Sequence, residues 1–172
     1  LTILQSIAIG DDRGYFERIF CADELRPFIA NRNIVQINHT YTTKRGTVRG
    51  LHFQYPPHTE IKMVTCLKGE VFDVAVDVRV GASFLEHHTE ILSATNRKIL
   101  LIPEGFAHGF QTLTDDCELL YLHTAAYYPS SEGALNAKDP LLSIKWPLSI
   151  SELSARDASH PMISEGFRGL SL

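Results

Sequence analysis

Short stretches in which hydrophobic and polar residues alternate recur along the chain, separated by turns that contain glycine or proline. Alternation with a period of two is typical of β-strands, because successive side chains point to opposite faces. The clearest example is residues 70–80, where Val71, Asp73 and Ala75 share one face and Phe72 and Val74 share the other. The pattern predicts strands at residues 1–9, 15–20, 33–42, 70–80, 89–95, 97–102, 109–114 and 117–125, with further β-structure around residues 49–54 and 61–65.

Helical signals are few. Residues 22–30 predict a short helix, with Asp23 and Glu24 in the first turn, where the helix dipole favours negative charge. The tail from about residue 129 is rich in loops, and we expect one short closing helix at residues 150–156. Many short strands at regular spacing, with little helix, indicate an all-β sandwich or barrel. No repeat or linker divides the chain, so we predict a single domain over residues 1–172.

Composition and charge narrow the class of protein. The 172 residues are 44% hydrophobic and 21% charged, with a net charge of -4, which argues against a nucleic-acid-binding protein. No apolar run approaches the roughly 20 residues of a membrane span. Cys21, Cys66 and Cys117 are scattered singly, without the C-x-x-C spacing of a zinc site. We therefore expect a reduced protein in the cytoplasm with no membrane partner.

Candidate chemistry is concentrated in residues 46–70. Arg49, His52 and Lys62 lie in or beside two predicted strands there, which indicates that neighbouring strands aim Arg49 or His52, together with Lys62, into one cavity. A histidine beside a lysine suits proton transfer next to a developing negative charge. Gln36 and Asn38 share one face of the strand at 33–42, and that face is either solvated or lines a polar cavity.

Two motifs resemble those of the cupin jelly roll: G-x-H-x-Q at residues 50–54 and P-x-G-x-x-H at residues 103–108. Metal-binding cupins carry H-x-H in the first motif, and here Gln54 replaces its second histidine. His58 and Glu60 are other possible ligands, but both follow two prolines in an expected loop. Because a metal needs three or four converging ligands, we expect no bound metal.

A closer resemblance covers residues 12–161. The chain is similar to the dTDP-4-dehydrorhamnose 3,5-epimerase family in six segments that occur in the same order: R-G-L-H-F-Q, E-I-K-M-V, G-E-V-F-D-V-A-V-D-V-R, I-P-E-G-F-A-H-G-F, D-P-L-L-S-I-K-W-P and L-S-A-R-D. The resemblance implies a cupin-type jelly roll with a few short peripheral helices and a homodimer. It also implies epimerisation of a nucleotide-linked 4-keto-6-deoxyhexose without a cofactor.

The resemblance further implies roles for individual residues. His52 would be the general base, oriented by Asp157, and Tyr121 would supply a proton from the opposite face of the sugar. Lys62 would lie beside the C4 oxygen of the sugar. The remaining matched residues would contact substrate: Arg49, His108 and Arg156 at the sugar and diphosphate, Arg13, Gln36 and Asn38 at the nucleotide or phosphates, partly across the dimer, and Tyr127 and Glu132 along the site.

Elementary chemistry agrees with these roles. A proton on a carbon next to a ketone is weakly acidic, and its removal leaves an enolate whose oxygen must be stabilised. A neutral histidine held by a carboxylate is a suitable base near neutral pH. Tyrosine, with an ordinary pKa of about 10, is protonated and can return a proton. Arginine binds diphosphate through forked hydrogen bonds.

Three departures from the family pattern leave substrate choice open. Arg18 stands where the family often has glutamate, residues 81–84 lack its usual S-P-T-F form, and residues 136–138 replace a frequent tryptophan. The alternatives are a CDP-linked sugar, inversion at C3 alone and a 3,4-ketoisomerase. Two further alternatives are a non-catalytic sugar-nucleotide-binding cupin and a metal-dependent cupin oxygenase.

Overall fold

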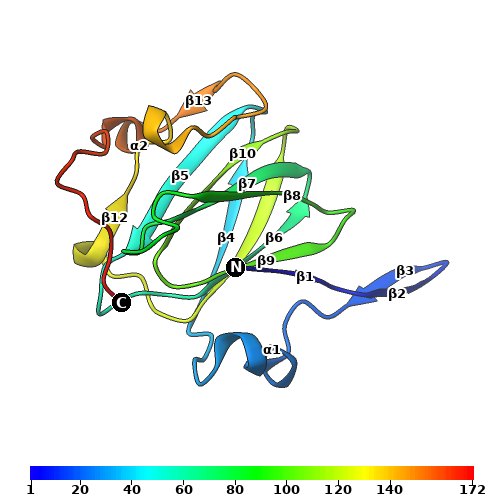
Figure 1. The fold of residues 1–172 in the computed structure, drawn as a ribbon. Helices are drawn as coiled ribbons and strands as arrows, with labels where there is room; N and C mark the ends of the chain where they lie inside the picture. Colours follow the sequence, from blue (N-terminus) through cyan, green and yellow to red (C-terminus); the bar gives the residue numbers. More distant parts are fainter.

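Two sheets face each other in the computed structural model, which describes residues 1–172 (Figure 1). Sheet 1 has the order β1 (Thr2–Gln5), β9 (Lys98–Ile102), β6 (Lys62–Lys68), β11 (Cys117–His123) and β4 (Gln36–Thr42). Sheet 2 has the order β12 (Glu132–Ala134), β5 (Thr47–Gln54), β10 (Phe106–Thr112), β7 (Glu70–Asp77) and β8 (His87–Ser93), and β13 (Glu152–Leu153) pairs with β5. Strands β4 to β7 alternate between the sheets, which confirms the predicted jelly roll.

The N-terminal region lies outside this sandwich. The predicted strand at 1–9 is two strands: β1 pairs with β9, and the chain leaves this sheet after Ser6, whose backbone N–H donates to the Arg97 carbonyl. The second of them, β2 (Ala8–Asp11), pairs with β3 (Gly14–Glu17) in a hairpin that projects from the body (Figure 1). Helix α1 (Ala22–Ile29), predicted within one residue, packs Leu25 and Ile29 against Met63 and Leu122 of sheet 1.

The C-terminal region differs from the prediction. Residues 150–156 do not form a helix, because Glu152 and Leu153 pair with the start of β5. The helix α2 (Ala155–Ser159) begins after Ser154, whose side chain accepts a hydrogen bond from the Asp157 backbone N–H. Two short 3₁₀ turns, η1 (Pro129–Ser131) and η2 (Pro140–Leu142), complete the elements. Neither α-helix is long and apolar enough to span a membrane.

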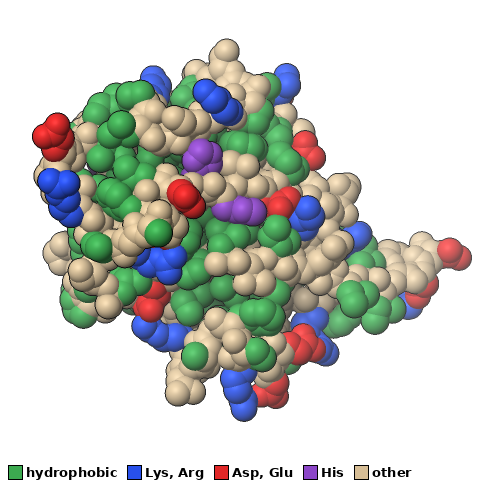
Figure 2. All heavy atoms as spheres, viewed as in Figure 1, with side chains coloured by type: hydrophobic (Ala, Val, Ile, Leu, Met, Phe, Trp, Pro, Cys, Tyr) green, Lys and Arg blue, Asp and Glu red, His purple; other side chains and the backbone are tan.

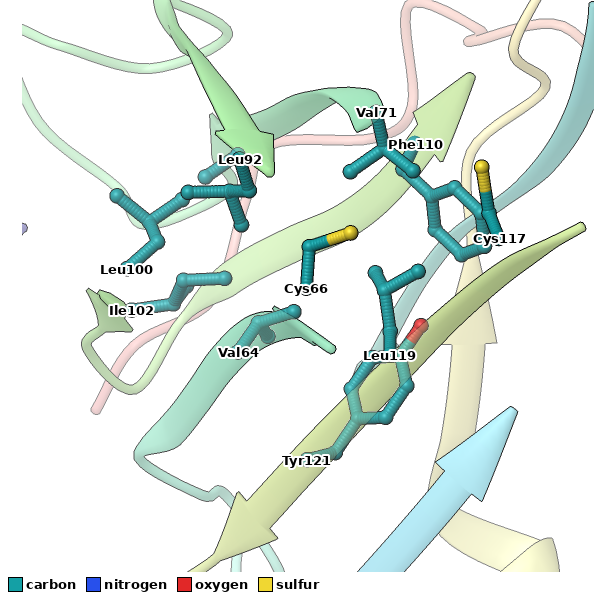
Figure 3. Packing of buried hydrophobic residues seen from close by; sticks show 11 residues of the cluster. Val64, Cys66, Val71, Leu92, Leu100, Ile102, Phe110, Cys117, Leu119 and Tyr121 are labelled. Carbon is teal, nitrogen blue, oxygen red and sulfur yellow. The ribbon is translucent and has the colours of Figure 1, made fainter. Parts of the chain in front are cut away.

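Both faces of β7 are buried, because apolar clusters lie on either side of sheet 2. Inside the sandwich, Val71 and Ala75 pack with a cluster that includes Val64, Leu119 and Tyr121 (Figure 3). On the other face, the loop-rich tail covers the sheet with Leu135, Leu142 and Leu170, and Trp146 packs against this cluster. The tail is therefore a packed layer of the domain, and it holds α2 beside β5.

A bulge at Gly50 determines which side chains enter the interior. Opposite β10, His52 pairs with His108 but Arg49 pairs with Phe110, so β5 carries one extra residue between these pairs. Arg49 and His52 consequently line the same cavity although they are three residues apart. Strand alternation alone places them on opposite faces. The strands that carry His52 and Lys62 are also not neighbours; they lie in opposite sheets.

We expect Gly50→Ala to destabilise the fold by about 1–3 kcal/mol, because Gly50 has φ of +112° and close neighbours. A Cβ there would lie 2.6 Å from both Gly109 Cα and His108 O. Urea unfolding measures the change. Gly166→Ala is the matched control, since its Cβ would meet only Ser164 Oγ at 3.6 Å. Equal stability of the two variants would contradict the requirement for glycine at position 50.

Candidate active site

A cavity of about 830 Å³ opens between the two sheets beside α2. Sheet 1 and sheet 2 each contribute polar side chains to its walls, and α2 closes one side. Asn38 of β4 is among the lining residues, so the face that carries Asn38 lines a polar cavity. The cavity brings together most of the predicted site residues: Asn38, Arg49, His52, Lys62, His108, Tyr121, Arg156 and Asp157.

His52 and Asp157 form a hydrogen-bonded pair on the sheet 2 side. His52 Nε2 lies 2.8 Å from Asp157 Oδ1, and the buried carboxylate can only accept, so Nε2 carries the proton. Burial alone would raise the pKa of Asp157, but the hydrogen bond and charge of His52 and the Gly50 backbone N–H hold it below its ordinary value. The pair therefore presents Nδ1 of His52 as a base.

Tyr121 lies on the facing wall, in sheet 1. Its side chain belongs to the interior cluster, and only 8% of the residue is exposed. Burial raises the pKa of Tyr121 well above its ordinary value, which keeps the phenol protonated at neutral pH. A base on one sheet and a protonated phenol on the other can act on opposite faces of a substrate between them.

His108 lies at the floor of the cavity and is bound by a second buried carboxylate. Its Nε2 is 2.9 Å from both oxygens of Asp73, a residue with no exposed surface. Burial lowers the pKa of His108; the Asp73 carboxylate opposes the shift without cancelling it. His108 is therefore a neutral hydrogen-bonding group at neutral pH, and Asp73 fixes its orientation.

Cationic side chains surround the cavity. Arg49 donates to Thr42 Oγ1 at 3.0 Å, and Arg156 pairs with Glu132. Tyr127 donates its hydroxyl to the same Glu132 at 2.9 Å. A side cavity of about 140 Å³ adjoins the main one, and the predicted residues Gln36, Tyr127 and Glu132 line it. All predicted site residues except one thus lie in the main cavity or beside it.

Arg13 is the exception. It lies at the tip of the β2–β3 hairpin, its side chain is 90% exposed, and it pairs with Asp11. It lines neither the main cavity nor the side cavity of its own chain. A contact between Arg13 and a nucleotide in this site therefore requires a second copy of the chain.

Gln54 and His58, which were considered for a cupin-type metal site, make other contacts. Gln54 uses its amide to bind the backbone of His58, Ala126 and Tyr128. His58 binds Ser131 and stacks on Tyr128. A different group, His52, Asp157 and His160, brings three potential ligand atoms within 4.8 Å of one another. Two of these three side chains, His52 and Asp157, are hydrogen-bonded to each other.

Sequence reasoning missed three polar residues of the site: His123 lines both cavities, Glu60 lines the side cavity, and the buried Asp73 binds His108. His123 follows Tyr121 by two positions on β11, so strand alternation places both on the cavity face. That signal was present in the sequence. Asp73 was assigned to the correct strand face, but nothing in its spacing pointed to His108.

The family model described as dTDP-4-dehydrorhamnose 3,5-epimerase matches residues 1–165. The enzyme of that name from Salmonella typhimurium is 42% identical over 166 residues, covering 95% of this chain and 90% of its own. The crystal structure of the Bacillus anthracis enzyme, with TDP and PPi bound, has a TM-score of 0.89 at 34% identity and covers 94% of this chain and 93% of its own. The Legionella pneumophila enzyme in complex with dTDP-4-keto-L-rhamnose has a TM-score of 0.87 at 38% identity, with coverage of 93% and 86%.

We expect His108 to make stability dependent on pH. Its lowered pKa stabilises the folded state fully above the unfolded-state pKa of about 6.5, and this contribution is lost as the pH falls through the folded-state pKa. The free energy of unfolding should therefore decrease as the pH falls below about 6.5. His108→Gln, which retains a donor to Asp73, should show a shallower decrease. Urea unfolding across this range measures both slopes, and identical slopes would be evidence against a buried neutral His108.

Proposed function

Because the chain belongs to the dTDP-4-dehydrorhamnose 3,5-epimerase family, we propose that it inverts C3 and C5 of dTDP-4-dehydro-6-deoxy-D-glucose, giving dTDP-4-dehydro-L-rhamnose. The observation that carries this proposal is the placement of His52 and Tyr121 on facing sheets of one cavity. Inversion requires removal of a proton from one face of a carbon and delivery to the other. A base and an acid on opposite walls meet that requirement.

The reaction uses one base, one acid and one stabilising charge. His52 Nδ1 takes the proton from the carbon next to the C4 ketone, and the C–H electron pair forms the enolate. The Asp157 carboxylate stabilises the resulting imidazolium. The Lys62 ammonium stabilises the negative charge on the C4 oxygen. Tyr121 then gives its proton to the opposite face of the carbon. Before the second inversion, the tyrosinate regains a proton from solvent and the His52 imidazolium releases one to solvent.

Arg49 and Arg156 suit the diphosphate of the substrate. Both line the main cavity, and guanidinium groups bind phosphate oxygens through paired hydrogen bonds. Arg156 is held in place by Glu132, which also accepts from Tyr127. This arrangement supports a nucleotide-linked sugar over a free sugar. All three cysteines are free thiols, which supports a cytoplasmic location.

A homodimer would explain the position of Arg13. Apolar side chains are exposed on the projecting hairpin (Figure 2). Ile9 of β2 is 72% exposed and Phe16 of β3 is 68% exposed. A second copy would cover these side chains and remove apolar area from water. The hairpin would then bring Arg13 toward the partner's cavity.

The activity is tested by proton NMR with dTDP-4-keto-6-deoxyglucose in D2O. We expect deuterium at both C3 and C5 and formation of the L-configured product. His52→Ala should lower the rate of exchange about 10²–10⁴-fold, because it removes the base. Tyr121→Phe should retain exchange but lose inversion at one or both carbons, since deuterium then returns from the side of His52.

Other outcomes separate the alternatives. Deuterium at C3 alone would indicate a 3-epimerase, and exchange only with the CDP-linked sugar would indicate a different nucleotide. Conversion to a 3-keto sugar would indicate the ketoisomerase. Binding of the nucleotide sugar without exchange at either carbon would overturn the enzymatic proposal and favour the binding module.

We expect the wild-type chain to sediment as a dimer and Phe16→Glu to sediment as a monomer. The new carboxylate would be buried at the interface without an oppositely charged group beside it, which is unfavourable. Sedimentation equilibrium gives the mass directly. Leu141→Glu is the control, since Leu141 is similarly exposed at 61% but lies in η2. A monomeric wild-type chain would refute the dimer.

A further inference from the structure

Three polar residues lie in one row across sheet 1, beside the proposed catalytic residues. Register pairs Lys62 of β6 with His123 of β11, and His123 with Gln36 of β4. On the same face of the sheet, the next row pairs Tyr121 with Asn38. His123 therefore lies on the cavity face of the sheet, directly beside the proposed acid, and it borders both the main cavity and the side cavity.

Glu60 connects two members of this row. One of its carboxylate oxygens lies 2.6 Å from His123 Nδ1, and the other lies 3.4 Å from Lys62 Nζ. The side chains are almost enclosed, with exposed fractions of 12% for Glu60 and Lys62 and 9% for His123. Burial alone would raise the pKa of Glu60, but His123 and Lys62 together hold it below its ordinary value. Glu60 is thus an ionised carboxylate inside the protein.

The hydrogen bonds continue in one direction from Glu60. Because the carboxylate accepts, His123 Nδ1 donates, and Nε2 accepts from Asn38 Nδ2 at 3.3 Å. Asn38 Oδ1 accepts from Gln36 Nε2 at 3.2 Å, and Gln36 Oε1 accepts from the Tyr127 backbone N–H at 2.8 Å. Each group donates to the next one toward Glu60, so the carboxylate sets the polarity of the whole chain.

The contact between Glu60 and Lys62 leaves the Lys62 ammonium able to donate hydrogen bonds to a substrate. A separation of 3.4 Å is long for a charge-assisted hydrogen bond, which is usually about 2.7–2.9 Å. The lysine has three N–H donors, so it keeps donors for a substrate oxygen. Its flexible four-carbon stem needs an external partner to hold the charge in one place.

We propose that Glu60 and His123 are positioning residues that hold Lys62 beside the C4 oxygen of the sugar and join it, through Asn38 and Gln36, to the Tyr127 segment. The role of Lys62 beside the C4 oxygen rests on the proposed function, whereas the hydrogen-bond chain does not depend on it. Glu60→Gln tests both parts. A carboxamide has one oxygen that accepts and one NH2 group that donates. Because an NH2 group against the Lys62 ammonium would put two donors together, the oxygen faces Lys62 and the NH2 group faces His123 Nδ1, which reverses the direction of the chain. The reversed chain ends with Gln36 Nε2 facing the Tyr127 N–H, which leaves two donors in contact.

The chain itself is tested without substrate, by ¹⁵N NMR of the histidine rings. The wild-type protein should hold His123 as the Nδ1–H tautomer, and Glu60→Gln should shift it toward Nε2–H. An Nε2–H tautomer in the wild-type protein, or no change in the variant, would overturn the chain. This readout is independent of turnover, so an inactive wild-type protein would refute the proposed function alone.

The role toward Lys62 is tested by a double-mutant cycle on the exchange rate in D2O. Glu60→Gln should lower kcat about 10²-fold with KM nearly unchanged, because a misplaced ammonium affects the enolate more than the bound ketone. In a Lys62→Met background, Glu60→Gln should change the rate less than about twofold. Independent losses that multiply would show that Glu60 does not act through Lys62. Glu104→Gln is the matched control, since Glu104 binds Thr59 and Arg32 and does not line the cavity.

Discussion

The hydrogen bond between His52 and Asp157 joins two segments that lie 105 residues apart, and the candidate site depends on it. Three local features bring the carboxylate to the histidine: β13 pairs with β5, Ser154 caps α2, and the tail packs on sheet 2. Without that docking, the cavity would lose one wall and the imidazole would lose the group that fixes its proton. The loop-rich end of the chain therefore belongs to the candidate site as much as the strands do.

Much of the fold follows from the sequence, because strand alternation is a local property. The strand β7 and the helix α1 are both found at the predicted residues, apart from their ends. The pair formed by His52 and Asp157 was predicted only through the resemblance to a known family. No rule of spacing connects these two positions, since their contact depends on how the whole tail folds back.

The remaining site features depend on geometry that alternation does not describe. The bulge at Gly50 turns Arg49 toward the cavity, and a count of residues cannot show a bulge. Glu60 and His123 meet across 63 positions, from the end of a loop to a strand of the same sheet as Lys62. Arg13 lines neither cavity of its own chain, so a nucleotide contact from Arg13 would need a second chain, which strand alternation cannot reveal.

Placement of His52 and Tyr121 on different sheets makes the interior packing part of the specificity of the protein. Facing sheets lie about 10 Å apart, and the side chains between them set that separation. Val64, Leu119 and Phe110 fill the sandwich next to the cavity. Val64 and Leu119 do not line the cavity, yet their volume helps to set the width of the slot that a sugar ring must fit. Selection on the size of the core is therefore also selection on which rings can reach both proposed proton-transfer groups at once.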